Sequence, residues 1–213
     1  MTNSISSNIC DVMGILEKKG LNTGATGNIS VKSEDAINIT PSGLCPAELG
    51  PEKIVSISIS GEYRGIWKPS SEWRIHTEIY KRYIGVGAVI HMHSPYATAL
   101  SCHCIDVPAF HYMVGAIGGD DIRCAPYETF GTKKLSEVVV VALQERMACL
   151  MANHGMLAVG PDLSSALETA ILVEELSKQY LLSKTIGDPI LISKQEMSVV
   201  VGKFQTYGSQ NAQ

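Results

Sequence analysis

The stretch Val86–His93, VGAVIHMH, constrains the fold of this 213-residue chain more than any other part of it. It is a short apolar run, bounded by a glycine and by a Ser-Pro pair, and this pattern predicts a buried strand. Because side chains on a strand alternate between faces, we expect His91 and His93 on one face and Met92 on the other. Two imidazoles on one face can bind a single metal ion, although two strand-end histidines that meet solvent would show the same pattern.

The composition is that of a globular protein, with 45% hydrophobic and 18% charged residues. A net charge of -4 and the lack of a basic run argue against a nucleic-acid partner or a membrane surface. No stretch reaches the roughly 18 apolar residues of a membrane span, and the first residues lack the pattern of a signal peptide. We therefore expect a cytoplasmic protein, and the absence of a visible linker or repeat predicts a single domain over residues 1–213.

Further strands are predicted over residues 29–31, 36–40 and 54–60, where β-branched residues cluster or alternate with polar ones. Several short strands near the start of the chain favour a mostly antiparallel or mixed sheet over a repeating βαβ plan. Apolar residues at helical spacing predict helices over 6–19, 135–145 and 163–183, and another that opens at 68–72 and runs to about Tyr83. The expected fold class is α/β, with a central sheet flanked by helices.

Two details of that fourth helix bear on function. Ser70 or Ser71 is expected as its N-cap, which places Glu72 in the first turn, where a carboxylate favours the helix dipole. By itself the position of Glu72 predicts only a favourable interaction with the helix dipole. We interpret His76, on the same helix, as a structural residue rather than as a metal ligand.

A second histidine lies at the end of another predicted strand. Residues 148–152 form a short apolar run that ends in Asn153-His154-Gly155. Three imidazoles from strand ends, His91, His93 and His154, would suit Zn²⁺ with an open fourth position. Nitrogen donors without a thiolate also suit manganese, iron or cobalt. These residues alone predict a metalloenzyme and no particular reaction.

Several motifs, in this order and spread over nearly the whole chain, resemble the class II aldolase/adducin family. They are Gly27-Asn28-Ile29-Ser30, Thr40-Pro41-Ser42-Gly43, Pro69-Ser70-Ser71-Glu72, His91-Met92-His93-Ser94-Pro95 and Asn153-His154-Gly155. Residues 108–113, 124–127, 129–132 and 203–208 resemble, within that family, the members that cleave L-fuculose 1-phosphate.

The resemblance implies a class II aldolase-like fold and a role for each matching residue. His91, His93 and His154 would hold one Zn²⁺ per subunit, with Glu72 coordinating the metal or lying beside it as the general acid/base. The substrate phosphate would be bound by Gly27, Asn28, Ser42, Gly43, Ser70 and Ser71. Tyr112 would protonate the aldehyde oxygen, Phe130 and Tyr207 would shape the aldehyde pocket, and both tyrosines would come from a neighbouring subunit of a C4 homotetramer.

The implied reaction is the reversible cleavage of a ketose 1-phosphate, L-fuculose 1-phosphate, to dihydroxyacetone phosphate and L-lactaldehyde. Aldolases for 5-deoxyribulose or 5-methylthioribulose 1-phosphate differ only in the aldehyde half of the substrate. An epimerase of the L-ribulose-5-phosphate 4-epimerase type would carry Asp in place of Glu72, and a dehydratase acting on 5-methylthioribulose 1-phosphate uses a related metal site. Adducin-like members lack the metal, and the presence of all three histidines with Glu72 argues against that alternative.

Overall fold

The computed structural model describes residues 4–34 and 36–207. The first three residues of the N-terminal segment, and Gly208 at the end of the predicted tail motif, lie outside the described residues. Within those ranges no helix has the length and apolar character needed to cross a bilayer.

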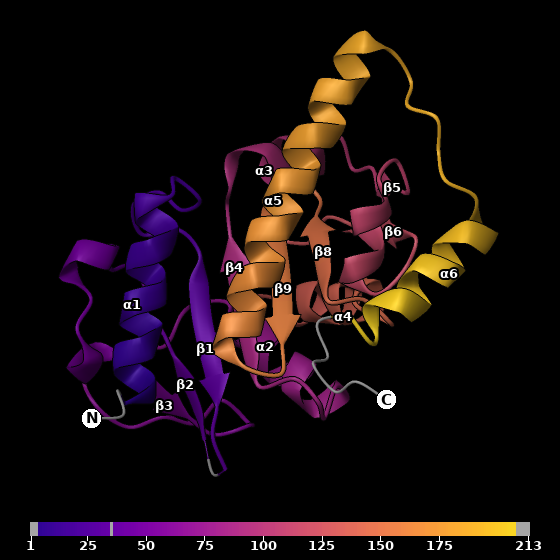
Figure 1. Ribbon diagram of the computed structural model, residues 1–213. Coiled ribbons are helices and arrows are strands. Elements are labelled where there is room, and N and C mark those ends of the chain that lie inside the picture. The colour runs from indigo at the N-terminus through magenta and orange to yellow at the C-terminus, as the bar shows by residue number, and fades with distance from the viewer. Residues whose placement is uncertain (1–3, 35, 208–213) are drawn as a thin grey trace.

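A seven-stranded sheet forms the centre of the molecule (Figure 1). Its order is β3-β2-β1-β4-β9-β8-β7, and every neighbouring pair is antiparallel except β7 and β8. The strands are β1 (Asn28–Lys32), β2 (Ile37–Ile39), β3 (Val55–Ile57), β4 (Ala88–Met92), β7 (Cys124–Ala125), β8 (Ala148–Met151) and β9 (Gly155–Gly160). The prediction of a mostly antiparallel, mixed sheet is confirmed.

Helices cover both faces of this sheet. One face packs against α1 (Ile5–Lys18), α3 (Pro95–Ser101) and α5 (Leu163–Ile186), and the other against α2 (Trp73–Arg82) and α4 (Lys133–Ala142). The alternation along β4 explains both layers, because Ile90 and Met92 lie in the first apolar cluster and Val89 in the second. His91 follows the parity of Val89, so the histidines are on the face covered by α2.

The remaining elements are short or lie at the edge of the sheet. Residues 107–131, a loop-rich stretch of the sequence, contain β5 (Val107–Pro108), the 3₁₀ helix η3 (Tyr112–Ile117) and β6 (Asp121–Ile122), and β5 pairs with β6. Two more 3₁₀ turns, η1 (Pro46–Glu48) and η2 (Pro51–Lys53), precede β3. One helix that was not predicted from the sequence is α6 (Lys194–Phe204), which packs on η3 through the buried Met197.

Candidate active site

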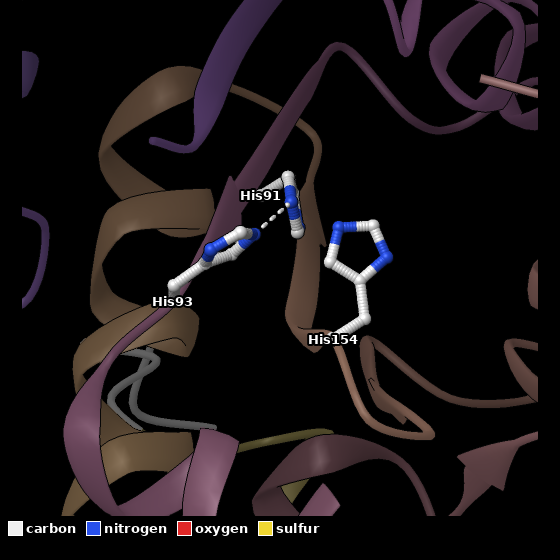
Figure 2. A group of neighbouring side chains, drawn as sticks. All are labelled: His91, His93 and His154. Atoms are coloured by element: carbon white, nitrogen blue, oxygen red, sulfur yellow. Dashed lines mark hydrogen bonds between the residues drawn. The ribbon is translucent and has the colours of Figure 1, made fainter. Parts of the chain in front are cut away.

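The three predicted metal ligands come together at the ends of two neighbouring strands (Figure 2). His91 lies in β4 and His93 directly follows it, while His154 lies in the turn between β8 and β9. Because β4 pairs with β9, that turn is held beside the two histidines. The ring centroids form a near-equilateral triangle with sides of 4.8, 4.9 and 5.0 Å, and the candidate ligand atoms lie within 4.8 Å of one another.

Glu72 reaches the same point from α2. Its Oε2 lies 3.0 Å from His91 Nε2, its Oε1 lies 3.4 Å from His154 Nε2, and only 6% of the residue is exposed. Glu72 itself occupies the N-cap position of α2, so the prediction that Ser70 or Ser71 caps this helix is wrong. The Ser70 hydroxyl instead accepts a hydrogen bond from the backbone N–H of Glu72 at 3.3 Å, within a turn that precedes the helix.

Burial and the contacts among Glu72 and the three histidines set the charges of these four side chains. Burial raises the pKa of the Glu72 carboxyl, but His91, His154 and the hydrogen bond from Asn28 together outweigh it, and the pKa falls to about 2. Burial lowers the pKa of His91, and the Glu72 carboxylate more than compensates, so that pKa is raised. Burial and the neighbouring His91 lower the pKa of His93 to about 4 and also lower that of His154. His93 and His154 are therefore neutral, as metal binding requires.

The space between these side chains suits a divalent cation. His91 Nδ1 lies 2.8 Å from the Met156 carbonyl, which can only accept, so Nδ1 carries a proton and Nε2 faces the site. That Nε2 is 3.0 Å from His93 Nε2, and two nitrogens bound tetrahedrally to one zinc ion would be roughly 3.3–3.4 Å apart. Glu72 Oε1 is buried and has no hydrogen-bond partner among the described residues. Three nitrogen donors beside a buried carboxylate oxygen that accepts no hydrogen bond within the described part of the chain fit a bound metal.

His93 and His154 line a cleft of about 470 Å³, and the buried His91 contacts both of them. Glu72, His93, His154 and Phe130 line this cleft. So do all six residues that are predicted to bind the substrate phosphate, which are Gly27, Asn28, Ser42, Gly43, Ser70 and Ser71. Backbone pairing explains why the segments meet. Pro41 and Pro69 form an isolated β-bridge, the Ser42 N–H donates to the Lys68 carbonyl, and the Ser70 N–H donates to the Thr40 carbonyl, each at 3.0 Å.

Two predicted site residues lie elsewhere in the chain. Tyr112 and Tyr207 line a separate apolar pocket between η3 and α6, with Phe204 between them. The rings of Tyr112 and Phe204 are nearly parallel with centroids 6.3 Å apart, and 52% of Tyr112 and 82% of Tyr207 is exposed. A single subunit therefore does not bring these tyrosines to the histidine cleft.

Sequence reasoning assigned no role to Tyr127, Glu128 and Asn153, which also line the cleft. The motif around Tyr127 resembles the family, and Asn153 directly precedes His154. Asn153 has a φ of +54°, which asparagine tolerates better than most residues and which turns the chain into the histidine. The asparagine directly before His154 was therefore the sequence signal for this turn.

Comparison with known proteins agrees with this geometry. Residues 7–181 match the family model "Class II Aldolase and Adducin N-terminal domain". A 5-methylthioribulose-1-phosphate/5-deoxyribulose-1-phosphate aldolase of Rhodospirillum rubrum is 50% identical over 91% of this chain and 87% of its own. An L-fuculose phosphate aldolase of Escherichia coli K12 is 42% identical over 97% and 96%. A solved L-fuculose 1-phosphate aldolase superposes with a TM-score of 0.92 at 36% identity, covering 96% of this chain and 98% of its own.

The chain therefore belongs to the class II aldolase and adducin family. Its relatives at these identities are aldolases, so the chain is an enzyme of the class II aldolase type, as its motifs predicted. The relatives divide between two kinds of sugar phosphate.

Proposed function

We propose that this enzyme uses Zn²⁺ to cleave a ketose 1-phosphate reversibly into dihydroxyacetone phosphate and an aldehyde. The observation that carries the proposal is the cleft itself. Turns rich in glycine and serine line one part of it, and Glu72, His93 and His154 line another part, with the buried His91 in contact with them. That separation suits a substrate with a phosphate on one side of its reacting carbonyl and the scissile bond on the other.

The turns would bind the phosphate. Ser70 and Ser71 lie just before α2, where the free N–H groups and the dipole of the helix favour an anion. The turn at Ser42 and Gly43 is held beside them by the Pro41–Pro69 bridge. Among the described residues that line the cleft none is lysine or arginine, so hydroxyl groups and backbone N–H groups would hold the phosphate.

His91, His93 and His154 would hold the metal. Zinc is supported by the set of three imidazoles, which is typical of catalytic zinc sites with one open position. When bound, the ion supplies Lewis acidity toward the ketose oxygens and so favours breakage of the neighbouring carbon–carbon bond. The Met156 carbonyl fixes the His91 ring so that Nε2 faces the site.

Glu72 would move the proton at C3. Cleavage breaks the C3–C4 bond, C4 becomes the aldehyde carbon, and the bonding electrons remain with the dihydroxyacetone phosphate half, which then gains a proton at C3. The buried Oε1 atom of Glu72, which has no hydrogen-bond partner among the described residues, is available for that transfer. In the direction of synthesis the same carboxylate would remove this proton.

The aldehyde side would be completed by a second subunit. Tyr112 and Tyr207 are exposed and lie in a pocket apart from the histidines. We propose that they reach the cleft of a neighbouring subunit in a C4 homotetramer, where Tyr112 exchanges a proton with the aldehyde oxygen. Phe130, which is 64% exposed at the cleft, and Tyr207 would form the apolar wall.

The terminal group of the aldehyde separates the candidate substrates. We rank 5-methylthioribulose and 5-deoxyribulose 1-phosphate first, because the relative named for these two substrates shares 50% of its residues with this chain and the Escherichia coli L-fuculose phosphate aldolase 42%. L-Fuculose 1-phosphate, which the sequence motifs favoured, is the second candidate. An apolar wall discriminates such groups by only about 1–3 kcal/mol, so we expect turnover of all three at different rates.

The experiment is a coupled assay in which a coupling dehydrogenase reduces the released dihydroxyacetone phosphate, and the oxidation of NADH is followed. Purified protein is given each of the three ketose 1-phosphates, with and without a chelator, and kcat/KM values are compared. We expect release that the chelator abolishes and Zn²⁺ restores, with the highest kcat/KM for one of the 5-substituted ribulose phosphates. Failure to release dihydroxyacetone phosphate from any of them, by protein that still holds metal, would contradict the proposal and lead to an epimerase assay.

A further inference from the structure

A row of buried polar side chains runs from Asn28, which contacts Glu72 at the cleft, into the core of the protein. Asn28 and Ser30 lie two residues apart on β1, and His76 and Tyr80 follow Glu72 at intervals of four on α2. These spacings place each set on one face of its element. The four residues are between 0% and 4% exposed, and they join into one continuous chain of hydrogen bonds.

The direction of each hydrogen bond follows from the Glu72 end. An ionised carboxylate only accepts hydrogen bonds, so Asn28 presents its Nδ2 group to Glu72 Oε2, at 3.3 Å. The Asn28 amide oxygen must then face the other way, toward His76 Nε2, with which it is hydrogen-bonded. Since the amide oxygen is an acceptor, His76 Nε2 must carry the proton.

The other ring nitrogen of His76 fits the same assignment. Burial lowers the pKa of His76 to about 3, so the ring is neutral and has only one N–H. His76 Nδ1 therefore accepts from the Ser30 hydroxyl at 2.7 Å. Having donated its proton, Ser30 Oγ can accept from the Tyr80 hydroxyl at 2.8 Å, and the same O–H donates to the Ser30 carbonyl at 3.0 Å. The protons that Ser30, His76 and Asn28 donate then point toward Glu72.

We propose that His76, held by Ser30 and Tyr80 in its Nε2–H form, is a positioning residue that fixes the Asn28 amide so that the NH₂ group faces Glu72. The row thereby holds the carboxylate in place for proton transfer at C3. As far as it concerns the reaction, this inference rests on the proposed function.

The rival explanation is that His76 only fills space in the core. Two substitutions of similar size distinguish these explanations, because each restores one ring nitrogen. In His76→Gln the side-chain amide can donate to Asn28 from the Nε2 position, whereas in His76→Asn it reaches only as far as the Nδ1 position, toward Ser30. If only volume mattered, His76→Asn, which is one methylene group smaller, would lose stability through the cavity that it leaves, and kcat of the folded protein would not follow the ring nitrogen that each variant restores.

The experiment measures kcat, KM and metal content for the zinc-loaded full-length protein and both variants. We expect His76→Gln to stay close to the wild type and His76→Asn to lose about 10- to 100-fold, mostly in kcat and with metal content unchanged. Equal losses in both variants, or a loss explained by missing metal, would overturn the inference. If neither variant folds, Tyr80→Phe replaces them, and a wild-type kcat for that variant would overturn it.

A second measurement does not depend on activity. Nitrogen NMR of histidine-labelled protein identifies the protonated ring nitrogen of each neutral histidine, and comparison with His76→Gln assigns the His76 signal. We expect the Nε2–H form, and an Nδ1–H form would overturn the inference even if the enzyme is fully active. If the wild type cleaves none of the ketose phosphates, the proposed function fails, and the protonation result still decides the orientation of the row.

Discussion

Glu72 Oε2 lies 3.0 Å from His91 Nε2, inside a site where His91 is 1% exposed and Glu72 6%. A carboxylate and a protonated imidazole in contact, both shielded from water, attract each other strongly. The contact connects the N-cap of α2 to the end of β4, so the proposed acid/base group lies beside the proposed metal ligands.

Replacing Glu72 by Gln tests the role of the carboxylate in proton transfer. The variant keeps the size of the side chain and all three histidines, so we expect metal content to remain while turnover falls by about 10²- to 10⁴-fold. Metal analysis and the coupled assay measure the two effects. Glu168→Gln, on the exposed face of α5, is the matched control and should behave as the wild type. Near-normal turnover by Glu72→Gln would remove Glu72 from the acid/base role.

The His154→Ala substitution tests the three-histidine site. Two imidazoles bind a divalent ion more weakly than three, so we expect the purified variant to lose metal and activity together. Metal analysis and thermal unfolding with and without a chelator give the comparison, and the chelator should lower the Tm of the wild type much more than that of the variant. His103→Ala, at an exposed histidine, should retain metal. A full complement of metal in His154→Ala would rule out the assignment.

Gly27 is expected to be intolerant of any side chain. Its φ is +70°, and a Cβ atom there would lie 2.7 Å from both the Asn22 Oδ1 atom and the His91 carbonyl oxygen. Gly24, in the same loop, has a φ of +61° but nothing within 4 Å of such an atom. Each Ala substitution should cost about 1–2 kcal/mol for the backbone conformation. Gly27→Ala should cost about 1–3 kcal/mol more for the clash and raise KM. Urea unfolding that gives equal losses for the two variants would contradict this.

Glu174, buried on α5, accepts three hydrogen bonds from the segment directly after His93. They come from the Ser94 hydroxyl at 2.6 Å and from the N–H groups of Tyr96 and Ala97 at 2.9 Å. Bonds to a charged group contribute about 1.5–3 kcal/mol each, so Glu174→Ala should lower the free energy of unfolding by at least about 3 kcal/mol. The exposed neighbour Glu175 should change it by less than about 0.5 kcal/mol when replaced by Ala. Similar unfolding midpoints for the two variants would show that the bonds contribute little.

Mixing subunits tests whether the site is shared. Tyr112→Phe should slow cleavage without changing metal content, because Tyr112 does not line the histidine cleft of its own subunit. When Tyr112→Phe and Glu72→Gln chains are refolded together, some sites would combine an intact Glu72 with an intact Tyr112 of the neighbour. We expect activity above the sum of the separate variants, and a tetramer mass by light scattering. Activity equal to that sum would place both groups within one subunit.

Much of the site could be predicted because its signals are local. The two-residue period of β4 predicted that His91 and His93 share a face opposite Met92, and the apolar clusters confirm it. The cap of α2 could not be predicted in the same way. Ser70 and Ser71 are good N-cap residues, but the backbone pairing of Ser70 with Thr40 extends the turn, and the helix begins only after Glu72. Likewise α6 has little local pattern, and its packing on η3 stabilises it.

The sequence by itself determined which groups are available and which way each faces, because strand and helix periods are properties of neighbouring residues. It identified the histidines, Glu72 and the serine- and glycine-rich turns, and the family to which they belong. The tertiary structure decided which of them meet. Pairing of β4 with β1 and β9 brings Asn28 and His154 to His91, and packing of α2 on β1 turns His76 from an apparent core residue into the partner of Asn28. Contacts between residues far apart in the chain depend on strand pairing and core packing, which no local pattern contains.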